Sequence, residues 1–327
     1  MYRLRLFEKL LKKSKKIFIY CHQNADPDAI CSAYAIKSLI KNLKKGAIVK
    51  IITPGGMNTL AKRVVDFIPI KSITEILSTK ADLIILADTN NIRQLGNHYE
   101  SLTNLKIPLV IIDHHTTHPD LKKSTSCIII NEKVSSTCEI VYEMYKRYKL
   151  KPSKKVANVI LIGIVYDTRH FILASSKCLI NVAELIHFGA SIEDAISIMR
   201  VPLNKPEIIA RLKALQRLVI SRADNWIIAA SEVNSYQASV ARILNYVGAH
   251  VSIVGGRNND RFIMSLRCKE NFHKKTGIHL GKDIAIPIAE RLNGSGGGHA
   301  MAAGINGVGD IDDIIEKCID KIREKLS

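Results

Sequence analysis

The chain has few cysteines, and none of them stand in a metal-binding pattern. Its seven cysteines are scattered through 327 residues, and no two have the two-residue spacing of a zinc ribbon. An odd, dispersed set is typical of buried thiols in a reducing cytosol. We therefore expect a cytoplasmic protein without structural zinc.

A long hydrophobic run and a secretory signal are also missing. The longest apolar stretch, VANVILIGIVY, is too short and too interrupted to span a bilayer. The N-terminal stretch MYRLRLFEKLLKKSKK is basic and lacks the apolar core and cleavage site of a signal peptide. It is typical of an amphipathic basic helix, which could touch nucleic acid or a membrane surface, although a solvated helix face explains it as well. No membrane partner is expected.

Acidic and aromatic residues are both scarce. The 30 Asp and Glu stand against 48 Lys and Arg, a net charge of +18. This surplus favours a polyanionic partner, above all nucleic acid, although a lysine-rich proteome would produce the same balance. Aromatic residues make up 6% of the chain, and Trp226 is its one tryptophan. Long single-strand grooves rely on aromatic stacking, so this scarcity favours a short nucleic acid over a long one.

Short apolar runs alternate with helical patterns in the first half of the chain. Strands are predicted at residues 16–20, 47–53, 81–88 and 107–115. Helices are predicted at residues 29–43, 59–68, 135–149 and 154–168. Nearly continuous apolar strands that alternate with helices indicate an α/β fold with a parallel sheet wrapped by helices.

The pattern changes near residue 190, and the length suggests two domains. We predict a metal-binding domain at 1–190, a helical connector at 191–222 and a smaller α/β substrate-binding domain at 223–327. Strands of the last domain are expected at 225–233 and 261–270. The apolar connector could pair two chains, which makes a homodimer a candidate assembly.

Metal-ligating residue types follow four apolar segments of the first domain. In chain order they are His22, Asp26, Asp28, Asp88, Asp113, His114, His115 and Asp167. Ligands of an open parallel sheet bind at the carboxyl ends of its strands, so these side chains should converge there. Singly, Asp88 or Asp113 could cap a helix, and Asp26 could shape a turn before Pro27.

Together these residues predict a divalent metal site, since clustered carboxylates without a cation would repel one another. Carboxylate and imidazole donors suit Mn²⁺ well, and Mg²⁺, Co²⁺ or Zn²⁺ are alternatives. We expect two cations, and Pro27 should direct Asp26 and Asp28 to different ones.

A second group of candidate functional residues lies near the C-terminus, in NGSGGGHAMAAG at 293–304. Glycine-rich backbone followed by a helix start would form an anion-binding nest, with His299 beside it. Arg267, at a predicted strand end, could complete a phosphate clamp. A tight turn with close helix packing explains the glycines equally well.

Four motifs, HQNADPDA, LADTN, IDHH and GIVYDT, resemble in this order those of the DHH phosphoesterase superfamily. GGGHAMAAG, with SLR upstream, is similar to the C-terminal domain associated with that superfamily. The resemblance spans essentially the whole chain and implies a hydrolase of two domains.

The resemblance also implies a role for each site residue. One metal would be held by His22, Asp26 and Asp88, and the other by Asp28, Asp88, His114 and Asp167. The remaining implied residues are His115 and Asp113 in catalysis, and Arg267, Gly296, Gly297, Gly298 and His299 in substrate binding.

The size and layout of the chain resemble the oligoribonuclease (nanoRNase) and pAp-phosphatase group. Short RNA or other single-stranded nucleic acid is therefore the expected substrate, with 3′-phosphoadenosine 5′-phosphate (pAp) as a further candidate. One alternative is a RecJ-like single-strand exonuclease. Another, of a different class, is a nucleic-acid-binding accessory protein with little catalysis.

Overall fold

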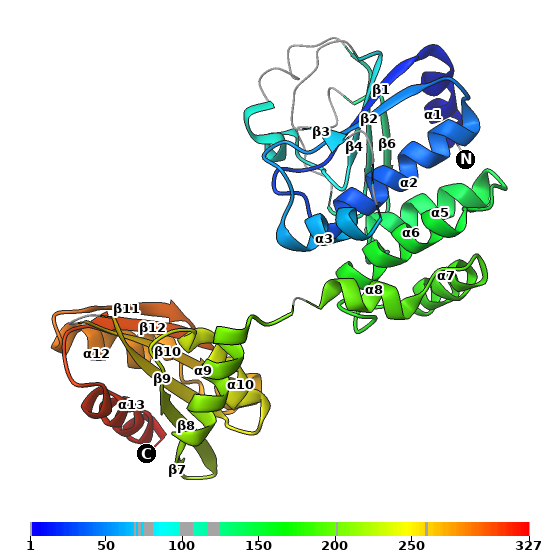
Figure 1. The fold of residues 1–327 in the computed structure, drawn as a ribbon. Coiled ribbons are helices and arrows are strands. Elements are labelled where there is room, and N and C mark those ends of the chain that lie inside the picture. Colours follow the sequence, from blue (N-terminus) through cyan, green and yellow to red (C-terminus); the bar gives the residue numbers. More distant parts are fainter. Residues whose placement is uncertain are drawn as a thin grey trace. The chain divides into compact units, whose positions relative to one another are not determined.

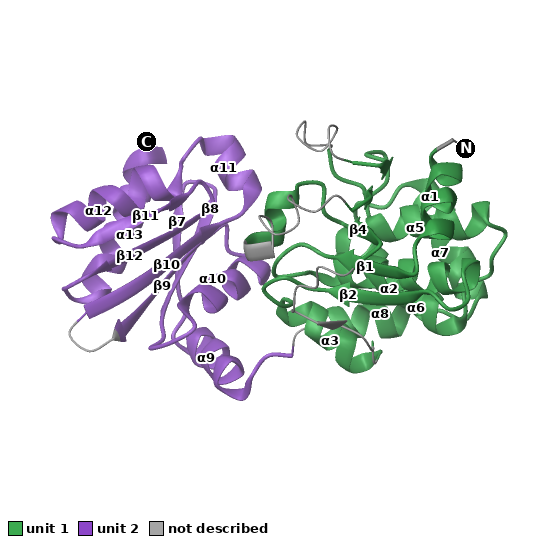
Figure 2. Ribbon diagram, turned by 90° about the horizontal axis from the view of Figure 1, so that it is seen from above, with its two compact units in different colours: residues 1–201 green, residues 202–327 purple. Residues whose placement is uncertain are grey.

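The computed structural model describes residues 2–68, 70, 73–74, 81–98, 107–116, 125–200, 202–258 and 261–326. The chain divides into two compact units, Met1–Val201 and Pro202–Ser327 (Figure 2). The segment expected as a connector contributes a helix to each unit, and the predicted boundaries at 190 and 223 stay predictions. In the described part of the chain, no helix is long and apolar enough to cross a membrane.

The first unit is built on a six-stranded sheet with the order β3-β2-β1-β4-β5-β6 (Figure 1). Its strands are β1 (Lys16–Tyr20), β2 (Ile48–Ile52), β3 (Ile73–Thr74), β4 (Leu83–Ala87), β5 (Leu109–Asp113) and β6 (Cys127–Ile130). Its helices are α1 (Tyr2–Lys13), α2 (Pro27–Leu43), α3 (Thr59–Phe67), η1 (Ile92–His98), α5 (Thr137–Arg147), α6 (Lys154–Asp167), α7 (Ser176–His187) and α8 (Ile192–Met199). Every strand pair is parallel, so the predicted fold class is confirmed.

Both faces of the central strands are covered, which explains why β4 is apolar throughout and β5 is apolar up to Asp113. Ile17 and Ile19 of β1 pack into the core formed with α2, α5 and α6, whereas Phe18 and Tyr20 pack on the opposite face. The helix predicted at 154–168 is α6, and its apolar sequence fits burial of most of its residues. Strand order runs outward in both directions from β1 and β4, so the loops after these two strands flank the crevice where such sheets bind ligands.

The second unit contains a six-stranded mixed sheet in the order β11-β12-β10-β9-β8-β7 (Figure 1). Its strands are β7 (Val219–Ala223), β8 (Trp226–Glu232), β9 (Val251–Asn258), β10 (Arg261–Cys268), β11 (Ser295–His299) and β12 (Ala302–Gly307). Its helices are α9 (Lys205–Gln216), α10 (Gln237–Tyr246), α11 (Glu270–Thr276), η3 (Leu280–Ala285), α12 (Ile286–Arg291) and α13 (Ile311–Leu326). One face packs on α11, η3, α12 and α13, and the other packs on α9 and α10.

The prediction of a helix start after His299 is wrong. The glycine-rich segment forms β11, which turns at Ala300 and Met301 into β12, and the two strands pair antiparallel. Ala303 and Ile305 are buried and their neighbours are more exposed, a period of two that fits a strand. Pairing of β12 with β10 therefore decides the structure of these small residues, and no helix N-terminus forms a nest here.

Candidate metal centre

All eight predicted side chains come together at the carboxyl edge of the parallel sheet. His22 and Asp26 follow β1, Asp28 lies in the first turn of α2, and Asp88 follows β4. Asp113, His114 and His115 lie at the end of β5, and Asp167 is the last residue of α6. Their ligand atoms form overlapping groups in which all atoms lie within 4.8 Å of one another.

One of these groups contains His22, Asp26 and Asp88. The Nε2 atom of His22 lies 3.8 Å from Oδ2 of Asp26 and 4.0 Å from Oδ2 of Asp88. Asp26 is also the N-cap of α2, since its Oδ1 accepts a hydrogen bond of 3.0 Å from the backbone N–H of Ala29. Pro27, at the first helical position, separates Asp26 from Asp28, and the two carboxylates belong to different groups.

The second group contains Asp28, His114 and Asp167. The Nε2 atom of His114 lies 3.3 Å from Oδ2 of Asp167 and 3.6 Å from Oδ1 of Asp88. Asp88 thus stands between the two groups. Its φ of 56° places it in the left-handed region, a conformation that non-glycine residues adopt at some energetic cost and that often marks functional sites.

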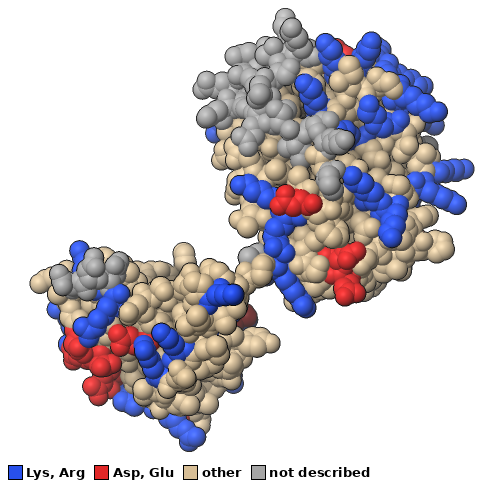
Figure 3. Space-filling view, viewed as in Figure 1, with Lys and Arg blue, Asp and Glu red and all other residues tan. Residues whose placement is uncertain are grey.

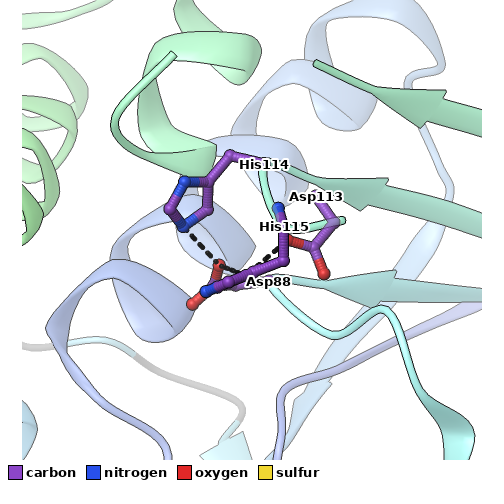
Figure 4. Close-up of side chains that lie close together, drawn as sticks. All are labelled: Asp88, Asp113, His114 and His115. Atoms are coloured by element: carbon purple, nitrogen blue, oxygen red, sulfur yellow. Dashed lines mark hydrogen bonds and ion pairs between the residues drawn. The ribbon is translucent and has the colours of Figure 1, made fainter. Parts of the chain in front are cut away.

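His115 lies beside the carboxylates of Asp88 and Asp113 at the end of β5 (Figure 4). Oδ1 of the fully buried Asp113 lies 2.8 Å from Nδ1 of His115 and accepts a hydrogen bond from its backbone N–H. The same Nδ1 atom lies 3.6 Å from Oδ1 of Asp88. Asp113 thereby fixes the orientation of His115, whose side chain is 55% exposed.

The N-terminus of α5 holds two of the carboxylates, a contact that our sequence analysis missed. The backbone N–H groups of Thr137 and Cys138 donate to the two carboxylate oxygens of Asp28, over 2.7 and 3.1 Å. The hydroxyl of Thr137 donates to Oδ1 of Asp88 over 2.8 Å. The signal was present in Ser135, Ser136 and Thr137, the residues that begin the helix predicted at 135–149.

Gly163 of α6 was likewise missed. A Cβ atom at this position would lie 2.7 Å from Oδ1 of Asp28 and 2.3 Å from Sγ of Cys138. Glycine therefore allows α6 to approach α2 and α5 closely while leaving space for the Asp28 carboxylate.

Burial controls the protonation of the acidic ligands. It raises the pKa of Asp28 and Asp88 well above the usual carboxyl range, and neighbouring carboxylates raise both further. Burial, followed by the charges of Asp88 and Asp26, raises the pKa of Asp167 to about 8. These three carboxylates are difficult to ionise together unless positive charge lies between them.

The pKa values of the three histidines are shifted in opposite directions by their surroundings. Burial lowers the pKa of His22, but the nearby Asp26 carboxylate and the hydrogen bond with the Gln23 carbonyl outweigh burial and raise the pKa to about 9. The hydrogen bond with Asp113 raises the pKa of His115 to about 9. Burial, and then the charge of His115, lower the pKa of His114, so its ring is neutral and suited to ligate a metal.

This donor set fits divalent metal ions. Among the described residues, Nε2 of His114 is buried and has no hydrogen-bond partner, although it faces the carboxylates of Asp88 and Asp167. A buried polar atom is rarely left unsatisfied, so this nitrogen needs a ligand. Imidazole and carboxylate donors together match Mn²⁺ and related cations.

The second unit places the predicted substrate residues across one face of its sheet. Ala302 of β12 pairs with Arg267 of β10 on one side and with His299 of β11 on the other. Residues directly opposite one another in a sheet share a face, so Arg267 and His299 project to the same side. Burial, followed by the charge of Arg242, lowers the pKa of Arg267, which indicates that positive charge collects on this face.

The three predicted glycines do not play the same structural part. A Cβ atom on Gly296 would lie 2.3 Å from the carbonyl oxygen of Ala285, and one on Gly298 would lie 2.3 Å from that of Ala302. Packing therefore requires glycine at both positions. A Cβ atom on Gly297 would meet nothing within 4 Å, so this glycine faces open space in the row of Gly304, beside the row of Arg267 and His299.

Comparison with known proteins identifies two family domains. Residues 16–164 match the DHH family, N-terminal domain, and residues 225–326 match the DHHA1 domain. Over 314 residues the chain is 33% identical to an uncharacterized protein of Methanocaldococcus jannaschii, and the match covers 95% of this chain and 93% of that protein.

Two other relatives carry informative names. Over 159 residues the chain is 29% identical to a probable manganese-dependent inorganic pyrophosphatase of Lactococcus lactis, and the match covers 47% of this chain and 49% of that protein. The structure of an exopolyphosphatase-related protein from Bacteroides fragilis shares the fold, with a TM-score of 0.61 and 18% identity over 99% of this chain and 96% of that chain.

Proposed function

Because this chain belongs to the DHH family of phosphoesterases, we propose that it hydrolyses short oligonucleotides with the help of two divalent cations, preferably Mn²⁺. The observation that carries the proposal is the pair of three-residue groups. One holds His22, Asp26 and Asp88, and the other holds Asp28, His114 and Asp167. Each offers a set of donors for one cation, and Asp88 lies between them, 3.6 Å from His114.

The chain's own residues have distinct tasks in this reaction. Cations at such a site lower the pKa of water and neutralise the charge that grows on phosphoryl oxygens. Asp113 accepts a hydrogen bond from Nδ1–H of His115, which leaves Nε2–H to donate a proton to the leaving oxygen. Asp113 is thus the residue that orients the proton donor.

The open face of the second unit favours a nucleotide as substrate. Arg267 offers a planar guanidinium that can grip a phosphate with two hydrogen bonds, and the exposed His299 shares its face. The open space over Gly297 allows a ligand to approach the backbone between these side chains. The few aromatic residues of the chain favour a substrate of few bases, which can include pAp.

Two other substrates deserve direct comparison. A long single strand would suit a RecJ-like exonuclease, which the net charge of +18 favours. Inorganic pyrophosphate is suggested by the Lactococcus relative, but that likeness spans about half of each protein. The Arg267 and His299 face lies in the second unit, whose family domain is DHHA1.

The test is Mn²⁺-dependent hydrolysis of a 5′-labelled RNA ladder of two to twenty nucleotides, with pAp and pyrophosphate as parallel substrates. We expect the shortest RNAs to be hydrolysed fastest and the Asp88→Asn variant to be inactive. Preference for the 20-mer would replace the proposal with a RecJ-like exonuclease. If no substrate is hydrolysed in a way that the Asp88→Asn variant abolishes, the protein would be one that binds nucleic acid without hydrolysing it.

A further inference from the structure

The first unit carries a larger net positive charge than the second, +13 against +5. Residues 1–201 contain 30 Lys and Arg against 17 Asp and Glu, whereas residues 202–327 contain 18 against 13. Five of the acidic residues in the first unit belong to the metal centre: Asp26, Asp28, Asp88, Asp113 and Asp167. The rest of its surface is therefore strongly basic.

Much of this charge lies at the end of the first unit opposite the metal centre. Three segments carry nine basic residues and no acidic ones: Lys12, Lys13, Lys15, Lys16, Lys44, Lys45, Arg147, Lys149 and Lys151. We call these nine residues the distal basic surface. Figure 3 shows blue side chains over the end of this unit where Figure 1 places α1 and the N-terminus.

The topology explains why these segments meet. Lys16 begins β1, α2 runs from the metal centre to Leu43, and α5 begins at Thr137 beside Asp28, so their other ends gather at the amino edge of the sheet. The Lys44 ammonium donates hydrogen bonds of 2.8 to 2.9 Å to the carbonyls of Leu11, Lys12 and Ser14, which ties α1 to α2. The basic residues are therefore held on one rigid scaffold.

A groove lies within this surface. It has a volume of about 380 Å³ and is lined by Glu8, Leu11, Lys12, Leu43, Lys44 and Tyr148. The exposed Lys12 side chain can contact a phosphate here, whereas the Lys44 ammonium donates to backbone carbonyls and Tyr148 packs against the core. Acidic side chains also lie here, since Glu8 lines the groove and the Asp82 carboxylate accepts hydrogen bonds from the backbone N–H groups of Lys15 and Lys16. The nine basic residues outnumber these two.

We propose that the distal basic surface binds the phosphate backbone of a nucleic acid that is longer than the substrate. A lipid surface fits less well, because a membrane-binding helix needs a free apolar face, whereas Phe7 and Leu11 of α1 are buried in the core of the unit. Lysine contacts carry little base specificity, so binding is independent of sequence and weakens steeply with salt.

This site is separate from the metal centre. Seventeen residues of α2 stand between the two ends, a helix length of about 25 Å. A dinucleotide cannot span this distance, so hydrolysis of the shortest substrates does not require the distal basic surface. The surface instead attaches the enzyme to a longer strand while the metal centre remains available.

The test measures binding of a fluorescent 20-nucleotide RNA in EDTA, which prevents metal-dependent hydrolysis. A test variant replaces one exposed lysine from each of the three segments: Lys12→Gln, Lys45→Gln and Lys151→Gln. A control variant removes the same charge from exposed positions of the second unit: Lys213→Gln, Lys275→Gln and Lys282→Gln. Thermal melts confirm that each variant is folded.

We expect the test variant to bind about tenfold more weakly or worse, with a salt slope that is smaller by about 2. The control variant and Asp88→Asn should bind like the wild type, and the test variant should still hydrolyse a dinucleotide. Single-stranded DNA of equal length serves as a second ligand. Binding of RNA or of DNA would fit the proposal, because both have the phosphate backbone that the lysines are proposed to contact.

Equal weakening in the test and control variants would overturn the proposal, because net charge alone would then explain binding. Binding by the test variant with the affinity of the wild type would also overturn it, because the RNA would then be bound elsewhere on the chain. Binding to vesicles rich in phosphatidylserine but not to RNA would identify a membrane surface. None of these results depends on hydrolysis, so a failure of the proposed activity can be distinguished from a failure of this site.

Discussion

The two units present their functional side chains in different ways. The parallel sheet of the first unit gathers charged groups at one edge, where Asp28, Asp88 and Asp113 are buried and the side chains share neighbours and hold one another in place. The mixed sheet of the second unit spreads Arg267 and His299 along a row of one face, where glycine leaves space for a ligand. The first arrangement suits metal ions held in a fixed geometry, and the second suits a ligand that binds and dissociates.

Replacement of the central carboxylate should have the largest effect. Asp88→Asn removes a donor from between the two groups, and we expect hydrolysis to fall by about 10³-fold or more. Steady-state kinetics with a dinucleotide measures this. Asp66→Asn, a carboxylate of α3 outside the metal groups, is the control, and an equal loss there would remove the distinction.

Loss of the Thr137 hydroxyl should weaken Mn²⁺ binding by about 10- to 100-fold, because it holds the Asp88 carboxylate. Thr137→Val keeps the shape of the side chain, and Thr137→Ser should restore affinity by restoring the donor. Calorimetric Mn²⁺ titration of both variants gives the answer. If valine and serine bind Mn²⁺ equally well, the hydroxyl does not position Asp88.

Arg267→Gln should weaken substrate binding by the second unit and leave the metal centre of the first unit unchanged. We expect the KM for an oligonucleotide to rise by about tenfold, with kcat and Mn²⁺ affinity nearly unchanged, because a charged hydrogen bond to phosphate is lost. Arg261→Gln, in the same strand, is the control. A fall in kcat at constant KM would assign Arg267 to the chemical step and erase the difference between the units.

A pair of glycine substitutions compares the two units in stability. Gly163→Ala should destabilise the protein by about 1–3 kcal/mol, since the new methyl group would overlap Asp28 and Cys138. Gly297→Ala has open space and should leave the melting temperature unchanged while raising the KM. Equal melting temperatures for the two variants would show that α6 does not pack as closely as described.

The metal-free protein should become less stable as pH rises. The folded state binds protons more tightly than the unfolded chain at Asp167, with a pKa of about 8, and at His22 and His115, each with a pKa of about 9. Stability is therefore lost as pH rises from about 4 toward 9. Melting temperatures in EDTA should fall by a few degrees across this range, and saturating Mn²⁺ should reduce the slope. A rise with pH would contradict the raised pKa values of Asp167, His22 and His115.

The sequence was most informative where strand ends determine position. His22, Asp88 and Asp113 could be assigned to one edge because parallel strands all end there. The hairpin at 295–307 could not be predicted in the same way, because small residues have weak preferences and pairing with β10 decides their structure. Thr137 and Gly163 act through contacts between helices far apart in the chain, so local pattern does not disclose them.

The distal basic surface illustrates the same limit. The basic N-terminal helix was visible in the sequence, but its neighbours Lys45 and Lys151 lie far along the chain. Only the fold brings them together and separates them from the carboxylates at the other edge. Net charge alone therefore could not distinguish a solvated helix face from a binding surface.

A Mn²⁺ titration of the metal-free protein by calorimetry tests the two-cation site most directly. We expect two ions per chain for the wild type and a loss of at least one in Asp88→Asn, because Asp88 stands between both groups of ligands. A single ion per chain, bound with the same affinity in Asp88→Asn, would contradict the two-cation site.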